Sequence, residues 1–343
     1  MSERRVRRAT IADVAGLAGV STATVSRAIN HADTVAPETA RHVRAAIEAL
    51  DYRPHAAAQV LARNRTNTIG LVFPEISGYY FASLLRGIAG GAGTYGYDLL
   101  IYSAQESATY RTAFQYPVGE QNTDGLLVFT DGLPEGELRR LQARGFPVVL
   151  MHWSPPAGLE IPSVTTENKA SAYRLVDHLI GVHGRRRIVF LAGPEEHEDS
   201  HWREKGYRQA LEAHSIPIDG ALIAAGGFDR EIARATVARL LRDGLDFDAI
   251  FAGDDDSATG ALTALLEAGR RVPEDVALVG FDDIDIAQHL NPPLTTVRVP
   301  VEQIGREAVG QLVHLIRTGE ADLLTLLPTQ LVIRRSCGCN VVH

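Results

Sequence analysis

The 343-residue sequence contains little that would suit a membrane-spanning or secreted protein. None of its apolar runs approaches the roughly 20 residues that a membrane helix needs. Residues 1–8 are charged and no apolar segment follows them, so we expect no signal peptide. The two cysteines, Cys337 and Cys339, lie too close in sequence for easy disulfide geometry. These absences predict a protein with no membrane partner in a reducing, cytoplasmic compartment.

Motifs for catalysis and for metal binding are also missing. The sequence has no P-loop, paired CxxC or nucleophile elbow. Cys337 and Cys339 with His343 are too few ligands for a four-ligand zinc site, so we expect no metal and no cofactor. Three aspartates at 254–256 could hold a metal or act as acid and base, but capping of a helix start explains them more simply. The sequence predicts a protein that is not an enzyme.

Charge is distributed unevenly along the chain. The net charge is −8, yet residues 1–66 hold 10 Arg against 6 acidic residues, a net +4, and the other 277 residues carry −12. A basic head on an acidic body is typical of a protein that meets a polyanion with one end only. A solvated charged face is the alternative interpretation.

The basic end has the pattern of a helix-turn-helix. Apolar residues recur at helical spacing over 11–18, Thr10 can cap that helix, and Gly19 permits a sharp turn. Ser21 can cap a second helix, whose outer face carries Thr22, Ala23, Ser26 and Arg27. A helix that begins with small and polar residues is suited to enter the DNA major groove. A small helical hairpin without a ligand is the alternative.

A third helix and a short hinge complete the head. Pro37 opens the third helix, and we assign residues 1–50 to a DNA-binding domain and 51–66 to a hinge helix or linker. The strong helix formers at 55–63 span only about two turns, so this segment needs a partner to be stable. Three arginines flank it, which indicates DNA phosphate as that partner: Arg53, Arg63 and Arg65.

Residues 67–343 alternate between short apolar runs and amphipathic helical segments. The apolar runs cover 69–73, 98–102, 125–129, 147–151, 188–192, 249–252 and 276–281. Continuous apolar strands separated by helices indicate buried parallel sheets, and two sheets fit the length better than one. Ligands of such sheets bind beyond the carboxyl ends of the strands.

The sequence resembles the LacI/GalR family of transcriptional regulators over nearly its whole length. The resemblance is carried by the Thr-Ile-Ala-Asp-Val-Ala…Asn pattern at 10–30, Gly-Phe-Asp-Asp at 280–283, Pro-Pro-Leu-Thr-Thr-Val at 292–297 and the closing segment 331–338. It implies an all-α helix-turn-helix head joined by a hinge helix to an α/β, periplasmic-binding-protein-like, two-lobed body. The expected N-lobe covers about 67–164 plus 295–326, and the expected C-lobe about 165–294 plus 327–343.

The resemblance assigns roles to residues of the head and hinge. Thr22 and Ala23 fall where the family selects its operator, and Arg27 falls on the arginine that contacts a base, plausibly guanine. Phosphate or capping contacts are expected of Thr10, Ser21, Thr24, Ser26 and Asn30. In the hinge, Ala58 and Leu61 match residues that approach the minor groove, and His55 replaces a common asparagine. For Leu61, packing against its own domain is the alternative.

Effector-site candidates come from strand ends and from the resemblance. Arg203 matches the family's effector-binding arginine and Asp255 the aspartate that accepts bonds from effector hydroxyls, a pair that could grip a diol. The sequence departs from the family at Gly78-Tyr-Tyr-Phe81 and at His152, where an aspartate is common. The full set is Tyr79, Tyr80, Phe81, His152, Trp153, Trp202, Arg203, Phe228, Asp255 and Asp282.

Both tryptophans fall at candidate effector positions. We expect at least one of Trp153 and Trp202 to line a carbohydrate site, with core or interdomain packing of both as the alternative.

These observations predict a homodimeric, sequence-specific DNA-binding repressor of carbohydrate-utilisation genes. Its partners are expected to be a pseudo-palindromic double-stranded operator and a small sugar effector that releases it. A corepressor-dependent regulator with a nucleobase or phosphosugar effector, a sugar-binding protein without a DNA role and a sugar-acting enzyme are the alternatives.

Overall fold

Two units make up the computed structural model, Met1–Thr66 and Asn67–His343. It describes residues 9–30, 34–52, 65–73, 78–103, 119–130 and 132–340. The hinge candidates His55, Ala58 and Leu61 lie outside these residues, so the hinge helix stays a prediction. Every described helix is too short or too polar to cross a membrane.

The first unit contains the predicted helix-turn-helix and third helix. Helices α1 (Ile11–Ala18), α2 (Thr22–Asn30) and α3 (Pro37–Ala49) enclose a small core that includes Val14, Val25 and Val43. A capping box starts α1: the Thr10 backbone N–H donates to Asp13 Oδ2 at 2.8 Å, and the Asp13 N–H donates to Thr10 Oγ1 at 3.3 Å. Gly19 ends α1 in the left-handed region, at φ 68°. Local capping rules therefore predicted this unit well.

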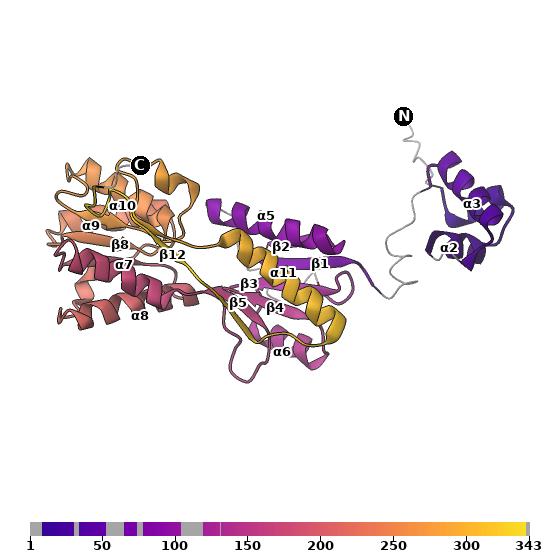
Figure 1. Cartoon of the computed structure of the whole chain (residues 1–343), viewed down its shortest axis with the longest axis horizontal. Helices are drawn as coiled ribbons and strands as arrows, with labels where there is room; N and C mark the ends of the chain where they lie inside the picture. Colours follow the sequence, from indigo (N-terminus) through magenta and orange to yellow (C-terminus); the bar gives the residue numbers. More distant parts are fainter. Residues whose placement is uncertain are drawn as a thin grey trace, which may run out of the picture. The chain divides into compact units, whose positions relative to one another are not determined.

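The first lobe of the second unit is built on a six-stranded parallel sheet. Its strand order is β11 (Leu324–Leu327), β5 (Ser163–Thr166), β4 (Val148–Met151), β3 (Gly125–Phe129), β1 (Thr68–Phe73) and β2 (Asp98–Ser103). Helices α5 (Gly78–Tyr95) and α11 (Val301–Thr318) lie side by side on one face, as Figure 1 shows. Helix α6 (Glu135–Ala143) packs on the other face.

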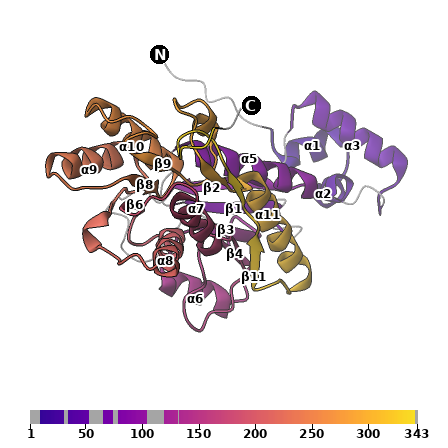
Figure 2. The same ribbon diagram turned by 60° about the vertical axis from the view of Figure 1, so that its left-hand side comes forward.

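The second lobe is built on a four-stranded parallel sheet. The order is β7 (Ile223–Ala225), β6 (Ile188–Ala192), β8 (Ala249–Ala252) and β9 (Ala277–Val279). Helices α7 (Lys169–Gly181) and α8 (Glu198–Ala213) cover one face. Helices α9 (Arg230–Arg242) and α10 (Asp255–Glu267) cover the other (Figures 1 and 2). Short 3-10 turns occur at Gly220–Leu222 and Asp285–Gln288.

Two short antiparallel strands belong to the crossings between the lobes. They are β10 (Thr296–Arg298) and β12 (Gln330–Val332). The expected lobe boundaries differ from this arrangement. Thr295 bridges Val279 of the second sheet, although we expected the N-lobe to resume at 295. The limits at 164 and 326 fall inside β5 and β11.

Two glycines bring α5 and α11 into close contact. A Cβ at Gly87 would lie 2.1 Å from the Glu302 carbonyl oxygen, and one at Gly305 would lie 2.7 Å from the Leu84 carbonyl oxygen. Any larger residue at either position would push the two helices apart. Because this pair covers the first sheet, it ties the chain's return crossing to the core of that lobe.

Candidate functional site

The second helix of the head presents the predicted DNA-reading residues to the surface. Thr22, Ala23 and Arg27 are exposed, whereas Val25 on the opposite side is fully buried. Ser21 Oγ accepts a bond from the Thr24 backbone N–H at 3.1 Å and so caps the helix. Ser26 and Thr24 are half-buried, and the side chain of Asn30 is outside the described residues. The α2 surface has the composition that its predicted role requires.

A second group of candidate residues meets at the carboxyl ends of strands from both lobes. We call this group the interlobe cluster. Its members are Tyr80, His152, Asn168, Asp199, Arg203 and Asp282. Strand β1 precedes the segment with Tyr80, β4 ends before His152, and β9 is followed by Asp282. These strand ends form the edge at which ligands of parallel sheets bind.

A chain of hydrogen bonds crosses from the first lobe to the second. Tyr80 Oη lies 2.6 Å from His152 Nε2, and His152 Nδ1 lies 2.8 Å from Asp199 Oδ2. Because an ionised carboxylate can only accept, the His152 Nδ1–H donates to Asp199. Asn168 Nδ2 donates to Asp199 Oδ1 at 2.8 Å. Asp199 therefore accepts bonds from both sides.

Arg203 is the best-connected residue of the interlobe cluster. It is 4% exposed, and its Nε donates to Asn168 Oδ1 at 2.9 Å. Its two Nη atoms donate to the Gly253 carbonyl at 2.6 Å and to Asp282 Oδ1 at 3.2 Å. The guanidinium lies 3.9 Å from the centre of the Phe281 ring, a cation–π contact. A buried charge held on all sides keeps one orientation, which is what recognition of a hydroxylated ligand needs.

Burial and charge shift the pKa values of the carboxylates here in opposite directions. Burial and the neighbouring Asp282 raise the pKa of Asp254 to about 7. Burial also raises the pKa of Asp282, although Arg203 opposes the shift. At Asp199 burial is outweighed by the charge and hydrogen bond of His152, so its pKa is lowered. The site therefore contains one firmly ionised carboxylate beside others that hold protons more readily.

Four backbone positions at this edge have positive φ without being glycine. They are His152 at 57°, Phe228 at 52°, Asp282 at 107° and Asp283 at 56°. Such conformations cost free energy and persist only where the surroundings hold them, and they concentrate at functional sites. Phe228 packs so closely that a Cβ on Gly193 would lie 2.4 Å from its ring. Phe228 of the second lobe is thus tightly packed beside Arg203.

Asp255 does not reach the interlobe cluster, contrary to our expectation. Its side chain is fully buried, its Oδ1 accepts from Thr296 Oγ1 at 2.7 Å, and its Oδ2 accepts from the Ile284 N–H at 2.9 Å. These bonds tie α10 to the β10 crossing, so Asp255 has a structural role. Asp254, one residue earlier, caps α10 through the Ser257 N–H at 2.9 Å and is 9% exposed. Asp254 is the better ligand candidate of the two.

Most aromatic candidates lie beside the interlobe cluster. Phe81 packs edge-on against Phe73, with 4.4 Å between ring centres, and so supports the site from the core. Phe228 lies 5.5 Å from the Arg203 guanidinium. Of Tyr79 only the backbone is described, within α5.

The two tryptophans occupy different environments. Trp153 packs into the core cluster on the α6 side of the first sheet. Trp202 is 38% exposed on α8, where its Nε1 donates to Glu198 Oε1 at 2.9 Å and Lys205 lies over its ring. Glu198 also accepts bonds from the Ser154 backbone N–H and hydroxyl, at 2.5 and 2.7 Å. Trp202 therefore adjoins an interlobe contact, whereas Trp153 adjoins the core.

Two members of the interlobe cluster were not predicted from the sequence. Asn168 follows β5, a four-residue strand of mixed polarity that the search for apolar runs passed over. Asp199 lies four residues before Arg203 on α8, one helical turn away. A rule that paired an expected site arginine with acidic residues at i−4 would have found Asp199.

Comparison with known proteins places this architecture in one family. Residues 10–55 match the family model "Bacterial regulatory proteins, lacI family", and residues 176–337 match "Periplasmic binding protein-like domain". The HTH-type transcriptional regulator CelR of Thermobifida fusca is 36% identical over 348 residues, covering 97% of this chain and 99% of CelR.

Solved structures agree over the same length. A transcriptional regulator CelR–cellobiose complex is similar with a TM-score of 0.70 and 32% identity, covering 96% of this chain and 100% of that one. A lac repressor dimer bound to operator and the anti-inducer ONPF gives a TM-score of 0.82 and 26% identity, covering 96% and 99%. The predicted head-and-body fold is confirmed, and the enzyme alternative is not supported. The chain belongs to the LacI family of DNA-binding transcriptional regulators.

Proposed function

We propose that the chain is a repressor that a sugar releases from its operator by binding at the interlobe cluster. The observation that carries this is Arg203, a buried guanidinium bonded to Asn168, Gly253 and Asp282 at the meeting edge of the two lobes. Fixed donors and acceptors of this kind match the hydroxyls of a carbohydrate. The similar CelR–cellobiose complex supports a sugar in preference to a nucleobase or phosphosugar.

The DNA-binding side of the proposal rests on α2. Arg27 is suited to donate its two-pronged bond to guanine, and Thr22 and Ala23 to face neighbouring bases. One head offers one recognition helix, so two copies in a homodimer would read two half-sites of a pseudo-palindrome. The similar lac repressor structure is a dimer on its operator. DNA as the target also supports a cytoplasmic location.

Effector binding is proposed to act by exchange of hydrogen bonds. The interlobe cluster satisfies its own polar atoms, so a sugar hydroxyl that enters must replace bonds such as His152–Asp199 and Arg203–Asp282. The bonds that join the lobes then change with occupancy, and the body settles in a different arrangement. Reciprocity requires the operator to weaken sugar binding by the same factor by which sugar weakens operator binding.

Ligand screening with the full-length protein tests this proposal. Mono- and disaccharides and nucleobases are screened by thermal shift, and each stabilising compound is then titrated against protein bound to DNA from upstream of its own gene, followed by fluorescence anisotropy. We expect a sugar to raise the melting temperature and to weaken DNA binding. A nucleobase that strengthens DNA binding would instead establish a corepressor. A sugar that binds equally well with and without operator would contradict the release model.

An Arg203→Gln variant tests the proposed effector site, and an Arg208→Gln variant is its matched control. Arg203→Gln keeps a donor on the side chain and removes the charge, so the sugar-induced rise in melting temperature should disappear. Arg208 on the same helix bonds only Glu204 among the described hydrogen bonds, and Arg208→Gln should respond to sugar normally. Loss of sugar response in both variants would assign the effect to α8 stability and not to the site.

A further inference from the structure

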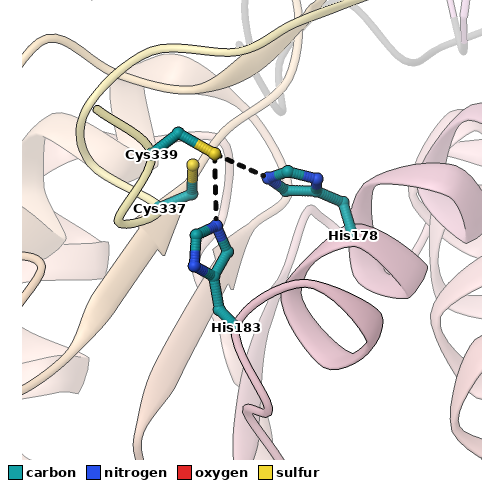
Figure 3. A group of neighbouring side chains, drawn as sticks. All are labelled: His178, His183, Cys337 and Cys339. Carbon is teal, nitrogen blue, oxygen red and sulfur yellow. Dashed lines mark hydrogen bonds between the residues drawn. The ribbon is translucent and has the colours of Figure 1, made fainter. Parts of the chain in front are cut away.

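Four potential metal ligands meet where the chain end reaches the second lobe. His178 lies in the last turn of α7, His183 follows that helix, and Cys337 and Cys339 come from the closing segment (Figure 3). One ligand atom from each residue lies within 4.8 Å of every other. We call these residues the His–Cys cluster. None of its members shares a described hydrogen bond with Arg203 or Asp199, so we treat it as separate from the interlobe cluster.

The distances inside the His–Cys cluster fit tetrahedral coordination. Zinc bonds of ~2.0–2.3 Å at tetrahedral angles place two ligand atoms about 3.3 to 3.8 Å apart. Cys339 Sγ lies 3.5 Å from His178 Nε2 and 3.3 Å from His183 Nε2, as the dashed lines in Figure 3 show. Cys339 therefore already has the spacing to each imidazole that two ligands of one ion would have, and the two imidazoles offer nitrogens within 4.8 Å of each other. The remaining sulfur, of Cys337, needs only a side-chain adjustment within the 4.8 Å limit.

The backbone around the cysteines is shaped for this approach. Gly338, between them, has φ 111°, and a Cβ there would lie 3.1 Å from His183 Nδ1. Glycine thus lets the chain turn against the His183 ring and directs both sulfurs to one side. The Thr295 hydroxyl donates to Cys337 Sγ at 3.1 Å, the kind of outer bond that supports a metal-bound thiolate.

We propose that His178, His183, Cys337 and Cys339 bind one zinc ion in a closed, structural Cys2His2 site. Two imidazoles and two thiolates are a ligand set that zinc favours, and four protein ligands leave no open position for a substrate. Each cysteine gives up its thiol proton to solvent when it binds. The ion would fasten the segment after β12, the last crossing between the lobes, to the end of α7.

This inference departs from our expectation of no metal site. The sequence pattern counted only the two cysteines and His343, and His343 lies outside the described residues. The missing ligands are 156 and 161 residues away from Cys339 along the chain. Only the fold brings them together, because α7 and the closing segment pack against the same core.

The first test measures metal in the full-length, tag-free protein. Protein purified without chelator is analysed by atomic emission, and chelator-treated protein is titrated with zinc and then with cobalt. We expect close to one zinc per chain. We also expect cobalt to give the strong visible bands of a tetrahedral site and a sulfur-to-metal charge-transfer band. Protein that neither carries nor takes up zinc would overturn the proposal, as would an octahedral cobalt spectrum.

Variants then test the ligand assignment. Cys339→Ser and His183→Asn should each reduce zinc to near zero and abolish the charge-transfer band or weaken it. His289→Asn, an exposed histidine in the same lobe, is the matched control and should keep the full zinc content. Zinc that survives both ligand variants, or that is lost equally in the control, would show that the ion binds elsewhere.

Thermal stability gives a readout that does not depend on spectroscopy. Zinc should raise the melting temperature of the unmodified chain by roughly 3 to 6 °C for each tenfold excess over its dissociation constant, and it should leave Cys339→Ser unchanged. An equal rise in both proteins would contradict the site. The zinc proposal does not require any change in how sugar releases the protein from its operator. A protein that binds no zinc would therefore leave the proposed function untouched.

Discussion

The two predicted recognition regions of this chain differ in the sequence spacing and the burial of their residues. On α2 the side chains predicted to read DNA lie within six consecutive positions, 22–27, and those that face outward are exposed. In the interlobe cluster the residues come from separate segments between 80 and 282, and Arg203 and His152 are almost completely buried. Exposed contacts can be lost one at a time. A buried network is changed as a whole, since each atom that loses a partner costs free energy.

The largest expected effect comes from removing the base-reading arginine. Arg27→Ala should cost about 1–3 kcal/mol per half-site and reduce the preference for operator over unrelated DNA accordingly. Arg65→Ala, also exposed, should weaken binding to all sequences alike and flatten the salt dependence by about one unit per lost phosphate contact. Anisotropy titrations with operator and scrambled duplexes at several salt concentrations separate the two. Normal operator preference in Arg27→Ala would contradict the role of α2.

A pair of aspartate variants sharpens the division between site and scaffold. Asp282→Asn weakens the charged bond to Arg203, so sugar affinity should fall roughly 10- to 100-fold with little loss of stability. Asp255→Ala leaves Thr296 and the Ile284 N–H without their buried acceptor, so the free energy of unfolding should fall by about 2–4 kcal/mol. Calorimetric titration and chemical denaturation measure the two quantities. Unimpaired sugar binding in Asp282→Asn would remove that residue from the site.

The pH dependence of stability should reveal Asp254. Its pKa is raised from 3.8 to about 7, so between these values the folded chain holds more protons than the unfolded one. Its contribution to stability is therefore present at low pH and is lost as pH rises through about 7, by at most ~1.4 kcal/mol per pH unit. Asp199, with a lowered pKa, acts in the opposite direction and below this window.

Denaturation curves across the window test this sign. The stability of Asp254→Asn should depend less on pH than that of the unmodified chain. An Asp254→Asn profile that overlays the unmodified one would place the shift elsewhere.

The smallest effect concerns fluorescence. Trp202 bonds Glu198 in the contact between the lobes, whereas Trp153 is half-buried and packs against the core of the first lobe. A sugar that changes the lobe contact should therefore alter emission in Trp153→Phe, which keeps Trp202, by a few tens of per cent. Emission in Trp202→Phe should stay nearly constant. The reverse result would mean that the sugar disturbs the first lobe's core.

How much the sequence revealed depended on the range of the interactions involved. Thr10 and Gly19 act on neighbours within a few residues, and capping rules predicted both roles. Helical periodicity also predicted that Val25 faces inward. The long apolar strands were found for the same reason. Strands β5, β7, β10, β11 and β12 were missed because segments of three or four residues that are partly polar or exposed carry too little pattern to stand out.

The three aspartates at 254–256 show where sequence reasoning stops. Among three adjacent aspartates, the sequence does not say which one starts α10 and which one points inward. The choice depends on Thr296, 41 residues later, which captures Asp255 and leaves Asp254 at the helix end. The His–Cys cluster depends likewise on packing between α7 and the chain end. Long-range partners, not residue types, decided both cases.

The shared carboxylate of Asp199 has a genetic consequence. Asp199 accepts bonds from His152 of the first lobe and from Asn168, which precedes α7 of the second lobe. In the proposed mechanism, a bound ligand and the contact between the lobes therefore compete for the same two carboxylate oxygens. A substitution that only weakens the His152–Asp199 contact would then imitate the bound sugar. Constitutive, inducer-independent mutants of this regulator should therefore be found at the His152–Asp199 contact, outside the predicted DNA-binding residues.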